Sequence, residues 1–237
     1  MRVTVIDNDQ VGIIVAGNTS VCEGFQTSIS VHLTSQPQTE VPITIRFSAA
    51  SAVIFFEHRT SSNITRMLPH KYLEGVVTTI YATNNEYDSV DILTNITVTL
   101  QSADPAYNSM MTSIPIVITN DDVAGVAVQP THVTVAEGKG AQAFSVRLQS
   151  KPVAAVSMAV RWEGDVTLAP ALLSFTAGSW NQWQQVHIEA VDDRIAEFTK
   201  FAKIWLTSAS LDAKYENATI DQVNVTVVDN DVAGLWL

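Results

Sequence analysis

The sequence spells one segment three times, and this repetition limits what the chain can fold into. Each copy is an alternating apolar and polar run that ends in a cluster of Asp and Asn, with a glycine shortly after. The copies occupy residues 3–12, 116–125 and 225–234. Within them, Asp9, Asp122 and Asp231 are spaced 113 and 109 residues apart. Such a period is too long for a solenoid repeat and is typical of a complete small domain.

The spacing predicts two complete domains between parts of two others. Residues 1–9 are expected to be the last strand of a preceding repeat, and residues 232–237 the first strand of a following repeat. The first complete domain is expected to span residues 10–122, and the second residues 123–231. Domains of this size can each bury their own hydrophobic core.

The regular segments show the period-two alternation of half-buried strands. Residues 28–33, 133–137 and 222–228 are clear examples, whereas residues 48–75 lack the pattern and are expected to be irregular. No segment shows a convincing helical period. About seven short strands in roughly 110 residues are typical of an immunoglobulin-like sandwich. The sequence therefore predicts an all-β chain of two tandem antiparallel β-sandwiches.

Composition excludes several classes of function. A net charge of −11 argues against nucleic acid and anionic membrane surfaces as partners. No apolar run reaches the roughly 18 residues of a membrane span. Cys22 is the single cysteine, so no internal disulfide can form. The five histidines lack the paired spacing of a zinc site, and there is no glycine-rich phosphate loop. We therefore expect no enzymatic activity, no nucleic-acid binding and no membrane insertion.

Acidic residues follow the strands that should end at one pole of the second sandwich. Successive strands alternate in direction, so the turns after strands one, three and five lie at the pole where strand seven ends. The nearby cations Arg161 and Arg194 are too few to neutralise these acids. Oxygen ligands at this density suit calcium, although Asp and Asn also cap turns without any ion. The candidate ligands are Glu137, Asp165, Asp192, Asp193, Glu197, Asp229 and Asp231.

The first domain has a weaker version of this set. Asn84 and Asn85 stand where the second domain has Asp192 and Asp193. An amide oxygen can bind a cation but contributes no charge, so a weaker calcium site or none is expected. The acids that could still contribute are Glu23, Asp91, Asp121 and Asp122.

These residues resemble a known family. Glu137-Gly138, the pair Asp192-Asp193 with Glu197, and the segment 225–234 are similar to the Calx-beta repeat, which forms the calcium sensors of sodium–calcium exchangers. Residues 175–188 resemble the variant found in tandem arrays of large algal, protist and bacterial surface proteins. The resemblance implies a sandwich that binds calcium with the loop after strand five and the tail of strand seven. The family usually has a second acid soon after the first Glu, but this chain has Thr199 and Lys200 there. The chain therefore lacks one of the acids of a full multi-ion cluster.

Five segments match the acceptor pattern for N-linked glycans, more than chance alone predicts. Thr-rich strands can also generate the pattern by accident. At Asn95 and Asn224 the strand alternation places the side chain on the solvent face. The matches indicate a glycoprotein at an extracellular or cell-surface location. The candidate positions are Asn18, Asn63, Asn95, Asn217 and Asn224.

The function predicted first is a structural segment of a long extracellular repeat protein, such as a surface filament, an adhesin or a ciliary fibre. Calcium would stiffen its domains, because only residues 123–125 connect them. Its expected partners are neighbouring repeats of the same chain, further copies in a filament, or other surface proteins and glycans. One alternative is a calcium-sensing regulatory module of a larger membrane-associated protein. Another is a carbohydrate-binding module in which Trp180 and Trp183 stack on a sugar.

Overall fold

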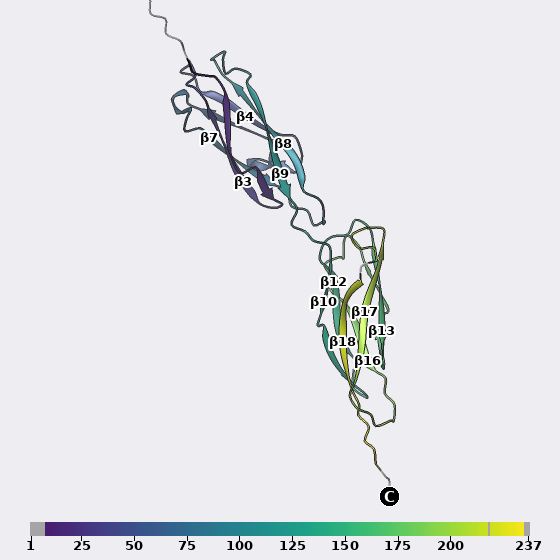
Figure 1. Cartoon of the computed structure of the whole chain (residues 1–237). Helices are drawn as coiled ribbons and strands as arrows, with labels where there is room; N and C mark the ends of the chain where they lie inside the picture. The colour runs from purple at the N-terminus through teal and green to yellow at the C-terminus, as the bar shows by residue number, and fades with distance from the viewer. Residues whose placement is uncertain (1–7, 218, 235–237) are drawn as a thin grey trace, which may run out of the picture. The chain divides into compact units, whose positions relative to one another are not determined.

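A computed structural model describes residues 8–217 and 219–234, and in that range the chain is built almost entirely of strands (Figure 1). The predicted all-β fold of two sandwiches is confirmed. Unit 1 comprises the described residues up to Asn85 together with Ser89–Asp121, and unit 2 comprises Glu86–Asp88 and the described residues from Asp122 onward. The helices of the described part are two single 3₁₀ turns, η1 (Glu57–Arg59) and η2 (Pro69–Lys71). No helix in the described residues is long and apolar enough to cross a membrane.

Unit 1 consists of a four-stranded and a five-stranded sheet. The strand order is β1-β3-β7-β5 in the smaller sheet and β2-β9-β8-β4-β6 in the larger one. The strands are β1 (Ile13–Gly17), β2 (Ser20–Cys22), β3 (Gln26–Leu33), β4 (Ile43–Ala49), β5 (Ile54–Phe55), β6 (Ser62–Met67), β7 (Val76–Ala82), β8 (Ile92–Gln101) and β9 (Met111–Thr119).

Unit 2 repeats this arrangement. Its smaller sheet has the order β10-β12-β16-β14, and its larger sheet has the order β11-β18-β17-β13-β15. The strands are β10 (Val126–Gln129), β11 (His132–Ala136), β12 (Gln142–Leu148), β13 (Val156–Glu163), β14 (Val166–Ala169), β15 (Leu172–Phe175), β16 (Gln184–Ala190), β17 (Lys200–Ser210) and β18 (Thr219–Val228).

One strand pair in each larger sheet is parallel, while its other pairs are antiparallel. In unit 1 the parallel pair is β2 with β9, and in unit 2 it is β11 with β18. Ala136, the last residue of β11, lies opposite Val228, the last residue of β18. The chain segments that follow these two strands therefore leave the sheet side by side at the same pole.

The alternating side chains of the strands form the core of each unit. In unit 2, Phe144, Val146 and Leu148 of β12 are fully buried, and Val225 and Val227 of β18 are nearly so. Burial of one such side chain contributes roughly 1.5–3 kcal/mol. The polar residues between them point outward. The alternation that predicts these strands is therefore the pattern that builds the core.

Residues 48–75, for which the sequence predicts no regular structure, contain β5 and β6. β6 pairs with β4 at the edge of the larger sheet of unit 1. Met67 is the one buried side chain of β6. Because an edge strand with so little apolar contact to the core shows no apolar alternation, the sequence pattern gave no indication of it.

A tyrosine fixes the loop before the last strand in both units. The hydroxyl of Tyr215 donates to the carbonyl of Ser150 (2.7 Å) and accepts from the backbone N–H of Ser150 (3.2 Å). In unit 1, Tyr107 makes the same two hydrogen bonds with Ser35, at 2.6 and 3.1 Å. Both tyrosine side chains are buried. Each sandwich is thus closed by the same contact at the pole where its last strand begins.

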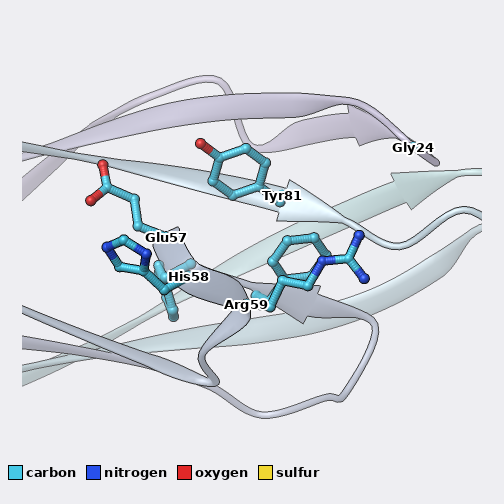
Figure 2. A pocket seen from close by; sticks show the side chains of 7 residues that line it. Gly24, Glu57, His58, Arg59 and Tyr81 are labelled. Atoms are coloured by element: carbon cyan, nitrogen blue, oxygen red, sulfur yellow. The ribbon is translucent and has the colours of Figure 1, made fainter.

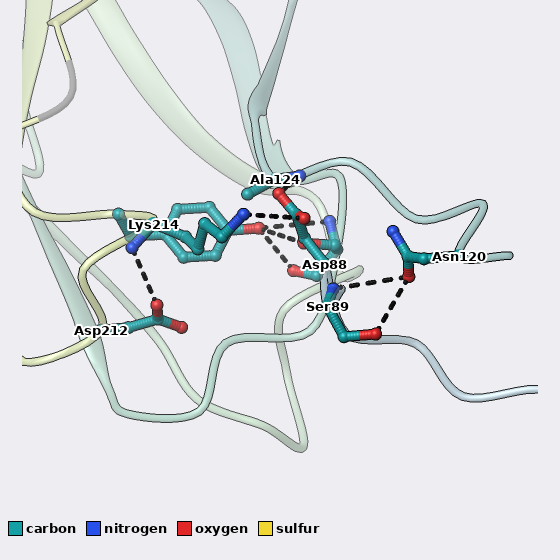
Figure 3. A network of polar contacts seen from close by, with 8 residues as sticks. Asp88, Ser89, Asn120, Ala124, Asp212 and Lys214 are labelled. Carbon is teal, nitrogen blue, oxygen red and sulfur yellow. Dashed lines mark hydrogen bonds and ion pairs between the residues drawn. The ribbon is translucent and has the colours of Figure 1, made fainter. Parts of the chain in front are cut away.

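The short segment Glu86–Asp88 is held by residues of unit 2, to which it belongs (Figure 3). Asp88 accepts hydrogen bonds from the backbone N–H of Ala124 (2.9 Å) and from Nζ of Lys214 (2.9 Å). The Ala124 N–H, followed by the Lys214 ammonium, holds the pKa of Asp88 below its ordinary value. Asp88 is therefore ionised near neutral pH and anchors this segment.

Candidate metal centre

The parallel pair β11–β18 places the first and last acidic segments of unit 2 beside each other. The backbone N–H of Glu137 donates to the carbonyl of Val228 at 3.0 Å, which continues the ladder one residue beyond β11. Asp229 and Asp231 follow directly on the other strand. The third contribution comes from the loop after β16, where Asp193 Oδ1 accepts from the backbone N–H of Ile195 (2.7 Å).

Three carboxylates from these segments meet at the acidic pole of unit 2. One oxygen each of Glu137, Asp193 and Asp231 lies within 4.8 Å of the other two. A calcium ion binds oxygen at 2.3–2.6 Å, so one ion can reach ligand oxygens spaced in this way. Glu137 and Asp231, the first and last of the three in the sequence, are 94 positions apart.

Glu137 is the buried member of this group. Its side chain is 3% exposed, and within the described residues its Oε2 atom has no hydrogen-bond partner. Buried polar atoms are nearly always hydrogen-bonded, since an unpartnered one is costly. Burial, followed by the charges of Asp229 and Asp193, raises the pKa of Glu137. The carboxylate therefore requires either a proton or a cation.

The two acids at the end of β18 differ in their electrostatics. Burial, together with the charge of Asp229, raises the pKa of Asp231, and Asp231 Oδ2 has no hydrogen-bond partner in the described part of the chain. Asp229 instead accepts from the backbone N–H groups of Glu197 (2.5 Å) and Asp231 (2.9 Å), and these bonds lower its pKa. Asp229 is thus a fixed negative charge beside the carboxyl groups of Glu137 and Asp231, which have few partners to neutralise them.

The backbone geometry of the loop explains why a glycine follows Glu137. Gly138 has a φ of +64°, a conformation that favours glycine. A Cβ atom at this position would lie 2.7 Å from Nδ2 of Asn230, which donates to Asp192 at 3.1 Å. Glycine therefore lets the loop turn tightly over the acidic segment while Glu137 remains buried.

Two of the predicted ligands are engaged by a lysine. Nζ of Lys200 lies 2.7 Å from Oδ2 of Asp165 and also forms an ion pair with Glu197. Hydrogen bonds to these two carboxylates raise the pKa of Lys200. Sequence reasoning identified Lys200 only as the replacement of an acid and did not foresee that its ammonium would neutralise two others. The signal was its spacing of three residues from Glu197.

Unit 1 has a corresponding buried glutamate, Glu23, with different hydrogen-bond partners. One of its carboxylate oxygens lies within 4.8 Å of an oxygen of Asp121, whereas the candidate Asp122 belongs to unit 2. Glu23 is 2% exposed, like Glu137. However, its Oε2 accepts from the backbone N–H of Asn85 at 2.9 Å and also from the Asn85 side-chain amide. The amide supplies donors at the position where unit 2 has an acid.

The remaining candidate of unit 1, Asp91, has a backbone hydrogen-bond partner. Asp91 is exposed, and its Oδ1 accepts from the backbone N–H of Asn120 at 3.0 Å. Asn84 donates to the backbone carbonyl of Asn85 at 2.9 Å. These two hydrogen bonds order the loops of unit 1 around Asn85 and Asn120.

The tryptophans proposed to stack on a sugar and the candidate glycan acceptors differ in their exposure and contacts. Trp180 packs against the core of unit 2, and the Arg147 guanidinium covers the Trp183 ring at 5.0 Å from its centroid. Among the candidate glycan acceptors, Asn63 is half-buried and its Nδ2 donates to Thr78 Oγ1 at 3.0 Å. The other four are exposed: Asn18, Asn95, Asn217 and Asn224.

No protein-family model matches the chain, and no curated protein matches it. Solved structures are similar to it at low identity. The apo-form Calx CBD1 domain matches with 24% identity and a TM-score of 0.36, covering 46% of this chain and 100% of that one. The calcium binding domain CBD12 of CALX1.1 matches with 14% identity and a TM-score of 0.47, covering 90% of this chain and 99% of that one. CBD12 from CALX1.2 matches with 14% identity and a TM-score of 0.45, covering 88% and 95%.

Proposed function

We propose that the acidic pole of unit 2 binds calcium. The observation that carries this proposal is the buried Glu137 carboxylate, whose Oε2 atom has no hydrogen-bond partner in the described residues while Asp193 and Asp231 converge on it. Because Glu137 is buried, the like charges of Asp193 and Asp231 repel its carboxylate more strongly than they would in bulk water. A bound cation would supply the missing partner and remove the repulsion.

The donor set favours calcium over magnesium. Calcium takes 6–8 oxygen ligands in flexible geometry, whereas magnesium keeps several waters and uses few carboxylates. Glu137, Asp193 and Asp231 would hold the ion, and the negative charge of Asp229 adds attraction. The contacts of Asp165 and Glu197 with Lys200 argue against a role for those two as ligands while the lysine is in place.

Calorimetric titration and thermal unfolding of the calcium-stripped chain test the proposal. The titration should show calcium binding, and calcium should raise the melting temperature of unit 2 more than magnesium at equal concentration does. Asp193→Asn should remove most of the response. Glu189→Gln, which removes an exposed acid of β16 outside the group, should respond like the parent. Equal responses in the two variants would place calcium elsewhere.

We further propose that the chain is a calcium-stiffened segment of a long extracellular repeat protein. The threefold recurrence of the strand-and-acid segment supports an array, and four exposed glycan acceptors support a secretory route. Mass spectrometry of the protein from its native source tests this, with glycans expected at Asn95 and Asn224. Asn63 should be unmodified, because its side chain is engaged. Unmodified asparagine at all five positions would count against the extracellular assignment.

The main alternative is a calcium-sensing module of a larger membrane-associated protein. Small-angle scattering with calcium and with chelator distinguishes stiffening from local binding alone. A narrower distribution of interatomic distances with calcium supports the structural role. Identical curves, in a protein that binds calcium by calorimetry, would favour the alternative.

A further inference from the structure

Unit 1 contains a pocket of about 550 Å³ on the outer face of its smaller sheet (Figure 2). This volume is within the range of small-ligand sites. The pocket is formed by β5, by η1 and by the end of β7. Its lining residues are Gly24, Phe55, Phe56, Glu57, His58, Arg59 and Tyr81.

An aromatic pair forms the apolar wall of this pocket. Phe55 of β5 and Tyr81 of β7 are direct cross-strand partners. Their rings are nearly parallel, with centroids 5.4 Å apart and an interplanar angle of 7°. Both side chains are half-exposed, because Ile54 and Phe56 on either side of Phe55 take the buried positions. The pair therefore presents an apolar surface to solvent.

Three consecutive polar residues project beside this pair (Figure 2). Glu57, His58 and Arg59 are exposed. In the described part of the chain their side chains make no hydrogen bond or ion pair, and Arg59 lies over the Phe55 ring at 5.7 Å from its centroid. Their donors and acceptors are thus open to a ligand at the pocket.

The backbone that carries these residues is strained. His58 and Arg59 have φ values of +58° and +57°, and neither is a glycine. Residues other than glycine are uncommon in this region, and strain of this kind collects at ligand sites. The turn orients the imidazole and the guanidinium at the same pocket.

We propose that this pocket binds one uncharged sugar unit of a glycan. The Glu57 carboxylate can accept hydrogen bonds from hydroxyls, and the Arg59 guanidinium can donate to their oxygens. The C–H face of a pyranose can pack against Phe55 and Tyr81. Because the opposite charges of Glu57 and Arg59 balance, the pocket offers an anion no net attraction to offset the loss of its hydration, and a neutral polyhydroxylated ligand suits it better. This inference is independent of the calcium site and concerns a different surface from the tryptophans of unit 2.

The test is a ¹H–¹⁵N NMR titration of the full chain, in chelator, with methyl glucoside, methyl galactoside, methyl mannoside and glucuronate. At least one neutral hexoside is expected to shift the amide signals of residues 55–59 and 81, with a dissociation constant in the millimolar range. Glucuronate should bind more weakly. Glu57→Gln and Arg59→Gln should each weaken binding about tenfold, since each removes a charged hydrogen-bond partner.

Arg66→Gln is the matched control, because Arg66 is an exposed arginine on β6 of the other sheet. It should leave the affinity unchanged. The absence of shifts with every neutral hexoside overturns the proposal. So does binding that Glu57→Gln and Arg59→Gln leave intact, or binding of glucuronate as tight as that of the neutral sugars.

Discussion

Asn85 donates two hydrogen bonds to one carboxylate oxygen of Glu23, from its backbone N–H and from its side-chain amide. In unit 2 the counterpart of this amide is Asp193, whose carboxylate can only accept and lies beside Glu137. The corresponding buried glutamates therefore differ: Glu23 has hydrogen-bond donors within its own unit, whereas Glu137 needs a cation. The difference between the amide nitrogen of Asn85 and the carboxylate oxygen of Asp193 separates the two cases.

Asn85→Asp should convert unit 1 into a calcium-binding unit. The variant keeps the backbone N–H but replaces the side-chain amide donor with a negative charge, so unit 1 should lose stability in chelator and regain it with calcium. Calorimetry should show a greater number of bound calcium ions than in the parent. Asn95→Asp, at an exposed position of β8, is the control and should keep the parent's number of ions. An unchanged number in Asn85→Asp would contradict the account of unit 1.

Glu137→Gln should stabilise unit 2 in chelator and abolish its response to calcium. The neutral side chain ends the repulsion with Asp193 and Asp231 and brings an amide donor, as Asn85 does in unit 1. In the parent, calcium at 100 times its Kd should add about 2.7 kcal/mol. This corresponds to a rise in melting temperature of roughly 10 °C for a domain of this size. Thermal unfolding of both proteins in chelator and in calcium measures the two effects together.

The stability of the calcium-free unit 2 should fall as pH rises above about 4.5, the ordinary pKa of a glutamate. The pKa values of Glu137 and Asp231 are raised in the folded state, so the folded state binds more protons in this window and loses stability as it releases them. Asp229 has a lowered pKa, so its contribution is lost only as pH falls below 3.8. Calcium should therefore stabilise more strongly at pH 7 than at pH 5. A calcium effect independent of pH would contradict this assignment.

Lys200→Gln should destabilise unit 2 in chelator and strengthen its binding of calcium. The substitution leaves Asp165 and Glu197 without their shared counter-ion, so both become available to a metal. Titration should show a lower Kd or an additional bound ion. Lys203→Gln, on the same strand with an exposed side chain, should change neither property.

Tyr215→Phe should destabilise unit 2 by about 1–3 kcal/mol, because the buried polar groups of Ser150 lose their partner. The calcium response should persist, since the tyrosine lies at the pole where β18 begins. Tyr107→Phe should do the same in unit 1 only. Denaturant unfolding resolves the two transitions. A variant that loses calcium binding would show that the two poles are coupled.

Much of this structure could be predicted from the sequence. In β12 from Ala143 onward and in residues 223–228 of β18, buried residues alternate with partly or fully exposed ones, and the sequence itself shows this alternation of apolar and polar residues. The convergence of acids at one pole followed from strand direction, and the parallel pairing of β11 with β18 is what brings Glu137 to Asp231.

Other features depend on side-chain reach, which a linear pattern does not encode. The position of the Lys200 ammonium between Asp165 and Glu197 depends on rotamers of three residues from different elements. β6 pairs through its backbone and buries only Met67, so its residues give no periodic signal. Likewise, His58 and Arg59 at the pocket have positive φ angles, which the sequence does not indicate because neither residue is a glycine.

The placement of β18 between β11 and β17 has a mechanical consequence. Tension applied to the chain just beyond Val228 acts along the axis of a strand that is hydrogen-bonded on both sides. Such a force loads the two ladders in shear, so many hydrogen bonds resist together instead of parting one after another. The residues through which the force enters are Asp229 and Asp231. An ion that tied Asp231 to Glu137 and Asp193 would distribute the force to β11 and to the loop after β16, and unit 2 would yield at a higher force with calcium than without it.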